Sequence, residues 1–125
     1  MTDGRLSTAS KGAQGEAAAA AFLQSQGWCV LERNFRCRAG EIDLIVRRDD
    51  LVAFVEVKAW RSVPEEDLGR SVGPRKRGRI ARAARVYLSR HPELAPAHLR
   101  FDVVFLGGEE SIRHIAGAFS EEGID

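Results

Sequence analysis

The sequence lacks the features of a membrane-embedded or disulfide-stapled protein. Its 125 residues contain no apolar run long enough to span a bilayer, and residues 1–15 are polar and small, unlike a signal peptide. Only two cysteines are present, Cys29 and Cys37, and they do not form the closely spaced pair of a zinc site. We therefore expect a cytoplasmic protein with no membrane partner, in which both cysteines are structural.

The chain also has almost no net charge, since 19 Lys and Arg balance 18 Asp and Glu to give a formal charge of +1. This total conceals an uneven distribution, because acidic residues gather near the end of the sequence and basic residues in its second half. A balanced total is therefore compatible with a basic face that binds nucleic acid. The basic cluster consists of Arg75, Lys76, Arg77, Arg79, Arg82, Arg85 and Arg90.

The length fits one domain, and the hydrophobic fraction of 44% is enough for a buried core. Apolar periodicity and turn signals predict an α/β fold, with a mixed β-sheet flanked by helices. We place a single domain at residues 10–116 and expect flexible tails at 1–9 and 117–125. The expected elements are a helix capped by Ser10 and ending near Gln26, strands at 29–35, 41–47 and 51–58, a loop at 61–74, a helix at 74–90, and strands at 99–106 and 111–115.

Two acidic residues on neighbouring strands are the first candidates for chemistry. If Asp49-Asp50 forms a two-residue hairpin loop, counting back from the loop pairs Asp43 with Glu56. Like charges directly opposite each other destabilise a sheet, so this pair needs a compensating cation. A divalent metal ion suits the pair, because hard cations prefer carboxylate oxygens. The inference depends on the register, since a slip of one residue would put the carboxylates on opposite faces.

Lys58 and Glu16 extend this candidate site. Lys58 follows Glu56 by two residues on the same face, where its ammonium group would orient a metal-bound water or stabilise charge on a phosphate, as phosphodiester hydrolysis requires. Glu16 aligns with Ala20 and Leu23 on the helix stripe that faces the sheet, where a carboxylate is unexpected without a partner.

Ordinary interpretations remain open for these acids. Carboxylates that alternate on a strand often form the solvated face of an antiparallel sheet, and a helix dipole favours an acid in the first turn. Against solvation, Ile45, Val52 and Phe54 share the face with the charges. Val55 and Val57 fill the other face, which indicates a central strand.

The helix expected at 74–90 carries the basic cluster on one side. Arg75, Arg79 and Arg82 are spaced at i, i+4 and i+7, with Arg85 beside them, and Lys76 near the helix start is placed to face the site. Such a stripe is often only a solvated face. Few acidic residues lie near it in sequence, however, and this favours contact with phosphate.

Several motifs, in order along the chain, resemble one known family. They are Gly15-Glu16 with Ala19 or Ala20, Asn34-Phe35, Gly40-Glu41-Ile42-Asp43-Leu44-Ile45, Phe54-Val55-Glu56-Val57-Lys58, Ala83-Ala84 with Tyr87-Leu88, and Arg100-Phe101-Asp102-Val103-Val104. Over about residues 12–106 they resemble the YraN-like family of bacterial proteins. That family looks like a branch of the restriction-endonuclease-like nucleases and is similar to archaeal Holliday-junction resolvases.

The resemblance implies a restriction-endonuclease-like fold and assigns roles to the site. Asp43, Glu56 and Lys58 match the aspartate, glutamate and lysine of the nuclease motif, and Glu16 matches the helix glutamate of the resolvases. The implied cofactor is Mg²⁺ or Mn²⁺, the implied partner is DNA, including branched DNA, and the implied assembly is a homodimer. The family often has an arginine two residues after the lysine; that position here is tryptophan, so Arg61 is the candidate substitute.

The leading hypothesis from the sequence is therefore a metal-dependent endonuclease acting on DNA. In it Asp43 and Glu56 hold the metal, Lys58 assists the reaction and Glu16 supports the site. The residues expected to bind nucleic acid are Arg61, Arg75, Lys76, Arg79 and Arg82. Two alternatives are a nucleic-acid-binding module that kept the fold without cutting, and a scaffold protein whose acidic cluster merely binds an ion.

Overall fold

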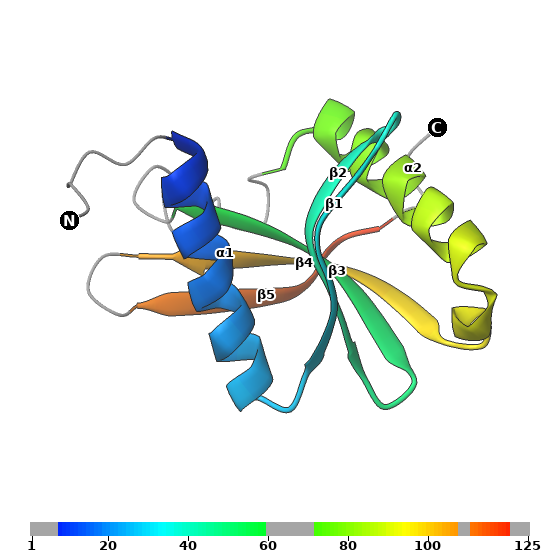
Figure 1. Ribbon diagram of the computed structural model, residues 1–125, viewed down its shortest axis with the longest axis horizontal. Helices are drawn as coiled ribbons and strands as arrows, with labels where there is room; N and C mark the ends of the chain where they lie inside the picture. Colours follow the sequence, from blue (N-terminus) through cyan, green and yellow to red (C-terminus); the bar gives the residue numbers. More distant parts are fainter. Residues whose placement is uncertain (1–7, 60–71, 108–110, 121–125) are drawn as a thin grey trace.

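A five-stranded sheet lies at the centre of the fold and carries one long helix on each face (Figure 1). The computed structural model describes residues 8–59, 72–107 and 111–120. In chain order its elements are α1 (Thr8–Ser25), β1 (Cys29–Cys37), β2 (Gly40–Arg48), β3 (Leu51–Ala59), α2 (Pro74–Arg90), a short 3-10 helix η3 (Pro92–Leu94), β4 (His98–Leu106) and β5 (Ile112–Phe119).

The strands follow their chain order across the sheet, β1-β2-β3-β4-β5. Three of the four pairings are antiparallel, and β3 pairs with β4 in parallel. A parallel pair requires a crossover, and α2 lies in the connection between the two strands. The expected α/β fold with a mixed sheet flanked by helices is confirmed, and the arrangement is consistent with a restriction-endonuclease-like fold.

The two helices cover opposite faces of the sheet, because alternate residues of β3 point in opposite directions. On one face Ala20 and Leu23 of α1 pack in a cluster that includes Val55. On the other face Ala84 and Tyr87 of α2 pack in a cluster that includes Phe54. Strand β3 is therefore buried on both sides, as its valine-rich sequence predicts. No helix in the described part of the chain is long and apolar enough to cross a membrane.

The expected helix at 74–90 matches α2 at both ends, because Pro74 favours the first helical position and His91-Pro92 ends the helix. The expected start of the first helix is wrong. Helix α1 begins at Thr8, so Ser10 lies inside the helix and is not its N-cap. Most of the loop expected at 61–74 lies outside the described residues.

The last strand is longer than predicted, since β5 continues to Phe119 and takes in residues 117–119 of the expected C-terminal tail. Two non-local contacts account for the difference. The Phe119 ring stacks on Phe101 of β4 at a centroid distance of 5.0 Å. The register shifts between Phe101 and Val103, and in this irregular stretch the Gly117 N–H donates to the Asp102 carboxylate at 2.9 Å.

Asp102 is the centre of a buried polar cluster that holds β5 against β4. Its carboxylate is fully buried and accepts two hydrogen bonds from Arg100, at 2.8 and 2.9 Å, and lies 2.7 Å from His114 Nε2. Burial raises the pKa of Asp102, but the hydrogen bonds from His114, Arg100 and the Gly117 amide outweigh it, so the pKa is lowered overall. The carboxylate is therefore charged and fully partnered. His114 of β5 therefore belongs to a buried cluster and is not a free surface residue.

The tip of the β1–β2 hairpin lies beside α2, at the upper right of Figure 1. Gly40, at the start of β2, makes this close approach possible. A Cβ atom at Gly40 would lie 3.1 Å from Arg79 Cβ and 3.2 Å from the Arg79 carbonyl oxygen. Glycine at this position thus sets the distance between the hairpin and the helix.

Replacement of Gly40 by alanine should therefore destabilise the protein by about 1–3 kcal/mol, because an added methyl group overpacks the contact. Urea denaturation would measure the loss. Gly73→Ala is the control, since a Cβ there meets no atom within 4 Å, and its expected cost is below about 1 kcal/mol from weaker helix capping. Equal losses in the two variants would contradict the role given to the close approach.

Candidate functional site

The β2–β3 hairpin has the register that the sequence predicts. Arg48 pairs with Leu51 across the Asp49-Asp50 turn, and the pairing continues to Leu44 opposite Val55. Asp43 and Glu56 come next on the two strands. At this point a side-chain hydrogen bond takes the place of backbone pairing between the strands, because Asp43 Oδ2 accepts the Val57 N–H at 2.8 Å. The two carboxylates therefore meet where the regular pairing of β2 and β3 ends.

The regular alternation of side chains between the two faces of the sheet is interrupted in β2 at Asp43. Strict alternation along a strand would put Ile42 and Leu44 on the same face, but Ile42 packs in the cluster under α2 and Leu44 packs in the cluster under α1. In the β1–β2 pair Arg33 lies opposite Leu44 and Phe35 opposite Ile42, so Asp43 lies opposite Asn34. The φ of Asn34 is 54°, in the left-handed region. Because of this local distortion, Asp43 lies between the two faces and is accessible to groups from both.

From the α1 side, Glu16 approaches Asp43. Burial raises the pKa of Glu16, a side-chain hydrogen bond with Asn34 lowers it, and Asp43 and Glu41 raise it further, with a net increase. Ala20 and Leu23 on the same helix stripe are fully buried, which confirms the predicted orientation of Glu16. The helix-dipole explanation for Glu16 is wrong, because α1 starts at Thr8 and places this residue in the middle of the helix.

From the α2 side, Glu56 is bound by Lys76. Only 6% of Glu56 is exposed, and its Oε2 atom forms an ion pair with the Lys76 ammonium group. Burial and then repulsion from Asp43 raise the pKa of Glu56, and Lys76 only partly offsets them, so that the pKa reaches about 7. Glu56 therefore holds a proton for part of the time at neutral pH. The expectation that Lys76 faces the site is confirmed.

The remaining predicted residues fall into three groups. Lys58 lies on β3 two residues beyond Glu56, and the alternation of the strand puts it on the same face, partly buried. Three arginines of the predicted stripe, Arg75, Arg79 and Arg82, are exposed on α2. Arg61 lies outside the described residues.

The donor set fits a divalent cation in chemistry. Asp43 and Glu56 are close enough to repel each other, and the Lys76 ammonium supplies the positive charge that their position requires. Asp43 Oδ2 accepts the Val57 N–H, which fixes the position of this carboxylate while lone pairs remain for a cation. Within the described ranges, no three histidine, cysteine or carboxylate side chains converge as a ready metal site. A metal ion would therefore have to displace the ammonium from Glu56.

Sequence reasoning missed Asn34, which contacts Glu16 from a strained backbone position. Two signals were available, because Asn34-Phe35 is one of the motifs of the resemblance and asparagine tolerates positive φ better than most residues. The partners of Glu56 were harder to find. Lys76 follows Glu56 by twenty residues, and only the packing of α2 on the sheet brings the two together.

The fold and the site define a small α/β domain with a partly buried carboxylate cluster at the end of a β-hairpin. The model of the uncharacterised protein family UPF0102 matches residues 15–106, and the chain belongs to this family. The match confirms the family-level resemblance seen in the motifs.

Close relatives are found in several bacteria. A UPF0102 protein of Rhodopseudomonas palustris is 47% identical over 115 residues, covering 92% of this chain and 87% of the relative. A UPF0102 protein of Azorhizobium caulinodans is 46% identical, with 90% and 85% covered. A UPF0102 protein of Nitrosomonas europaea is 45% identical, with 92% and 98% covered. The likeness therefore extends over nearly the whole chain.

The raised pKa of Glu56 predicts that the metal-free protein loses stability as the pH rises from about 4.5 to about 7. The folded state binds the proton more tightly than the unfolded state, so the stabilisation is present at low pH and is lost through this window. Relative to Glu56→Gln, which cannot ionise, the wild type should lose on the order of 2 kcal/mol between pH 5 and pH 8.

Chemical denaturation at a series of pH values, with a chelator present, measures this difference. The matched control is Glu93→Gln, which removes an exposed carboxylate on η3 that takes no part in the carboxylate cluster and should follow the wild type. A constant difference between the wild type and Glu56→Gln across the pH range would contradict the proposed environment of Glu56.

Proposed function

We propose that the protein is a metal-dependent endonuclease that hydrolyses phosphodiester bonds in DNA, branched DNA included. One observation carries the proposal: Asp43 on β2 has Glu16 of α1 and Glu56 of β3 as carboxylate neighbours, and the Lys76 ammonium pairs with Glu56 where a metal ion would bind. Such clustering of like charges costs stability, as the raised pKa values of Glu16 and Glu56 indicate. A strained group of this kind is typical of a functional site.

In this proposal Asp43 and Glu56 hold Mg²⁺ or Mn²⁺. When bound, the ion supplies Lewis-acid stabilisation of the phosphate and lowers the pKa of a bound water. To hold the ion, Glu56 would have to be ionised, with its proton released to solvent, and would have to part from Lys76. Lys58, on the same face of β3, holds its ammonium toward the developing negative charge of the phosphate. Glu16 holds its carboxylate next to Asp43, where it accepts a hydrogen bond from Asn34 and orients the polar groups around the ion.

The basic side chains of α2 would bind the DNA backbone. Arg75, Arg79 and Arg82 are exposed along the helix, and Lys76 joins this surface to the carboxylate cluster. Arg61 is a further candidate phosphate contact. Because such contacts release counterions, we expect the affinity for DNA to fall steeply with salt. The likeness of the motifs to archaeal Holliday-junction resolvases supports branched DNA as a substrate and a homodimer as the acting form.

A binding module without catalysis is the second candidate, and a specific observation favours it. The Lys76 ammonium already neutralises Glu56, so the cluster is satisfied without a metal ion. A protein of this fold that had lost catalysis would retain such an internal ion pair together with the basic helix. The two candidates differ in whether a metal ion displaces Lys76.

Cleavage of DNA provides the direct test. End-labelled four-way-junction, flap and linear DNA are incubated with purified protein and Mg²⁺ or Mn²⁺. We expect cuts that require the metal and fall by at least about 100-fold in Asp43→Asn and Lys58→Ala, because each removes a group that acts on the reacting phosphate. Glu93→Gln, an exposed acid on η3, is the purification-matched control and should cut like the wild type. Equal cutting by all variants would reveal a contaminant and overturn the catalytic proposal.

Metal binding itself is expected to raise the melting temperature of the wild type, because a ligand that binds only the folded state stabilises it. The shift with Mn²⁺ should disappear in Asp43→Asn and persist in Glu93→Gln. It should also become larger in Lys76→Ala, in which the Lys76 ammonium no longer competes for Glu56. A thermal shift that is identical in all four proteins would place the metal elsewhere and favour the binding module.

A further inference from the structure

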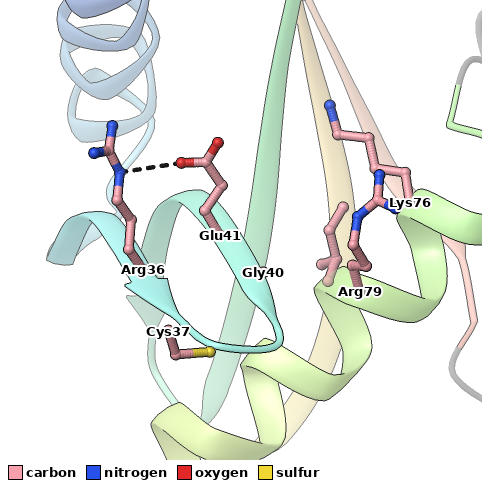
Figure 2. Close-up of a pocket in the computed structure, with 7 residues that line it drawn as sticks. Arg36, Cys37, Gly40, Glu41, Lys76 and Arg79 are labelled. Atoms are coloured by element: carbon pink, nitrogen blue, oxygen red, sulfur yellow. Dashed lines mark hydrogen bonds and ion pairs between the residues drawn. The ribbon is translucent and has the colours of Figure 1, made fainter.

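A cavity of about 400 Å³ lies between the tip of the β1–β2 hairpin and the first turns of α2. Figure 2 shows that Arg36 and Glu41 stand on the hairpin, while Lys76 and Arg79 approach from the helix. The size suits a phosphate group with part of the attached nucleoside. Its lining residues are Arg36, Cys37, Gly40, Glu41, Lys76, Arg79 and Ile80.

The charges of the lining favour an anion, because Arg36, Lys76 and Arg79 line the cavity with one carboxylate, that of Glu41, and Lys76 shares its charge with Glu56 outside the lining. The start of α2 adds to this field. Its N-cap, Gly73, provides no side-chain hydrogen bond, and its first turn holds no acidic residue. Basic side chains lie instead at the positive end of the helix dipole, an arrangement that is unfavourable until an anion binds there.

Two guanidinium groups are available to such an anion. Arg36 pairs with Glu41 at 3.1 Å, but their side chains are 74% and 59% exposed, and exposed ion pairs of this kind contribute little stability. Across the cavity, Arg79 is exposed and makes no ion pair with any carboxylate in the described part of the chain. A single guanidinium group donates two parallel hydrogen bonds to a phosphate, and this cavity has one such group on each of two walls.

Lys76 connects this cavity to the carboxylate cluster, because it lines the cavity and also binds Glu56. We propose that the cavity holds a DNA backbone phosphate adjacent to the one placed at Asp43 and Glu56, gripped by Arg36 on the hairpin and Arg79 on α2. This inference rests on the proposed function for its substrate class. It adds a defined subsite, in which the phosphate displaces Glu41 from Arg36. The hairpin tip then becomes part of the DNA-binding surface of the protein.

The two cysteines provide a direct probe of occupancy. Cys37 lines the cavity, whereas Cys29 is exposed at the opposite end of β1 and serves as an internal control. The rate at which iodoacetamide alkylates each thiol is followed by mass spectrometry, without metal so that no DNA is cut. We expect a four-way-junction DNA that binds the protein to slow alkylation of Cys37 at least about fivefold and to leave Cys29 unchanged, because a seated phosphate blocks access.

Three variants distinguish a specific phosphate subsite from nonspecific attraction of DNA to the basic side chains. Arg79→Ala should weaken DNA binding and lower the salt slope of log affinity by about one, the value for one lost phosphate contact. Glu41→Gln should strengthen binding and increase protection of Cys37, since Arg36 loses its competitor. Arg38→Ala is the matched control, because it removes the same charge next to Cys37 from a residue that does not line the cavity. Circular dichroism verifies that each variant folds.

The outcomes distinguish this inference from the proposed function. Protection of Cys37 that depends on Arg79 supports the subsite, even if no variant of Lys58 alters cleavage and the catalytic proposal fails. DNA that binds and is cut while Cys37 reacts at its free rate overturns the subsite alone. Protection by inorganic phosphate at low millimolar concentration, with none by DNA, also overturns it and assigns the cavity to a small phosphate ligand. No binding of DNA at all overturns both proposals.

Discussion

The carboxylate of Glu56 is buried beside the like charge of Asp43, and the Lys76 ammonium offsets part of the repulsion. A buried charge without a partner costs several kcal/mol, so this contact constrains everything around it. It requires α2 to begin where Lys76 reaches Glu56 on β3, and the tip of the β1–β2 hairpin lies against Arg79 of the same helix. The glycine at position 40 permits that approach. The sheet and the crossover helix are thus joined by one ion pair, and the hairpin tip lies across the cavity that Lys76 also lines.

Much of this arrangement follows from local sequence. The Asp49-Asp50 turn sets the register of β2 and β3, and the valine-rich run around Val55 predicts a strand buried on both faces. Proline at position 74 and the His91-Pro92 pair set both ends of α2. Because the register and the faces of a hairpin are decided within a few residues, the meeting of the two carboxylates is predictable from the amino-acid order alone. The approach of the helix glutamate likewise follows from its spacing.

Other features could not be found in this way, because they arise from contacts between distant segments. Ile42 changes face through a distortion of the strand opposite it, which no alternation pattern records. Phe119 extends β5 by stacking on Phe101, and the bonds that hold His114 and Gly117 depend on the buried Asp102. The cavity is likewise invisible in sequence, since its walls are joined only by tertiary packing.

The two irregular strands, β1 and β5, are also the two edges of the sheet. Strand β1 contains a bulge between Val30 and Glu32 and carries the charged Arg33 and Arg36, and β5 departs from regular pairing around Gly117. Such interruptions prevent an edge from adding further strands, which protects the monomer from aggregation through open β-sheet. A second copy of the chain would meet an interrupted strand at either edge, which disfavours edge-to-edge pairing between copies.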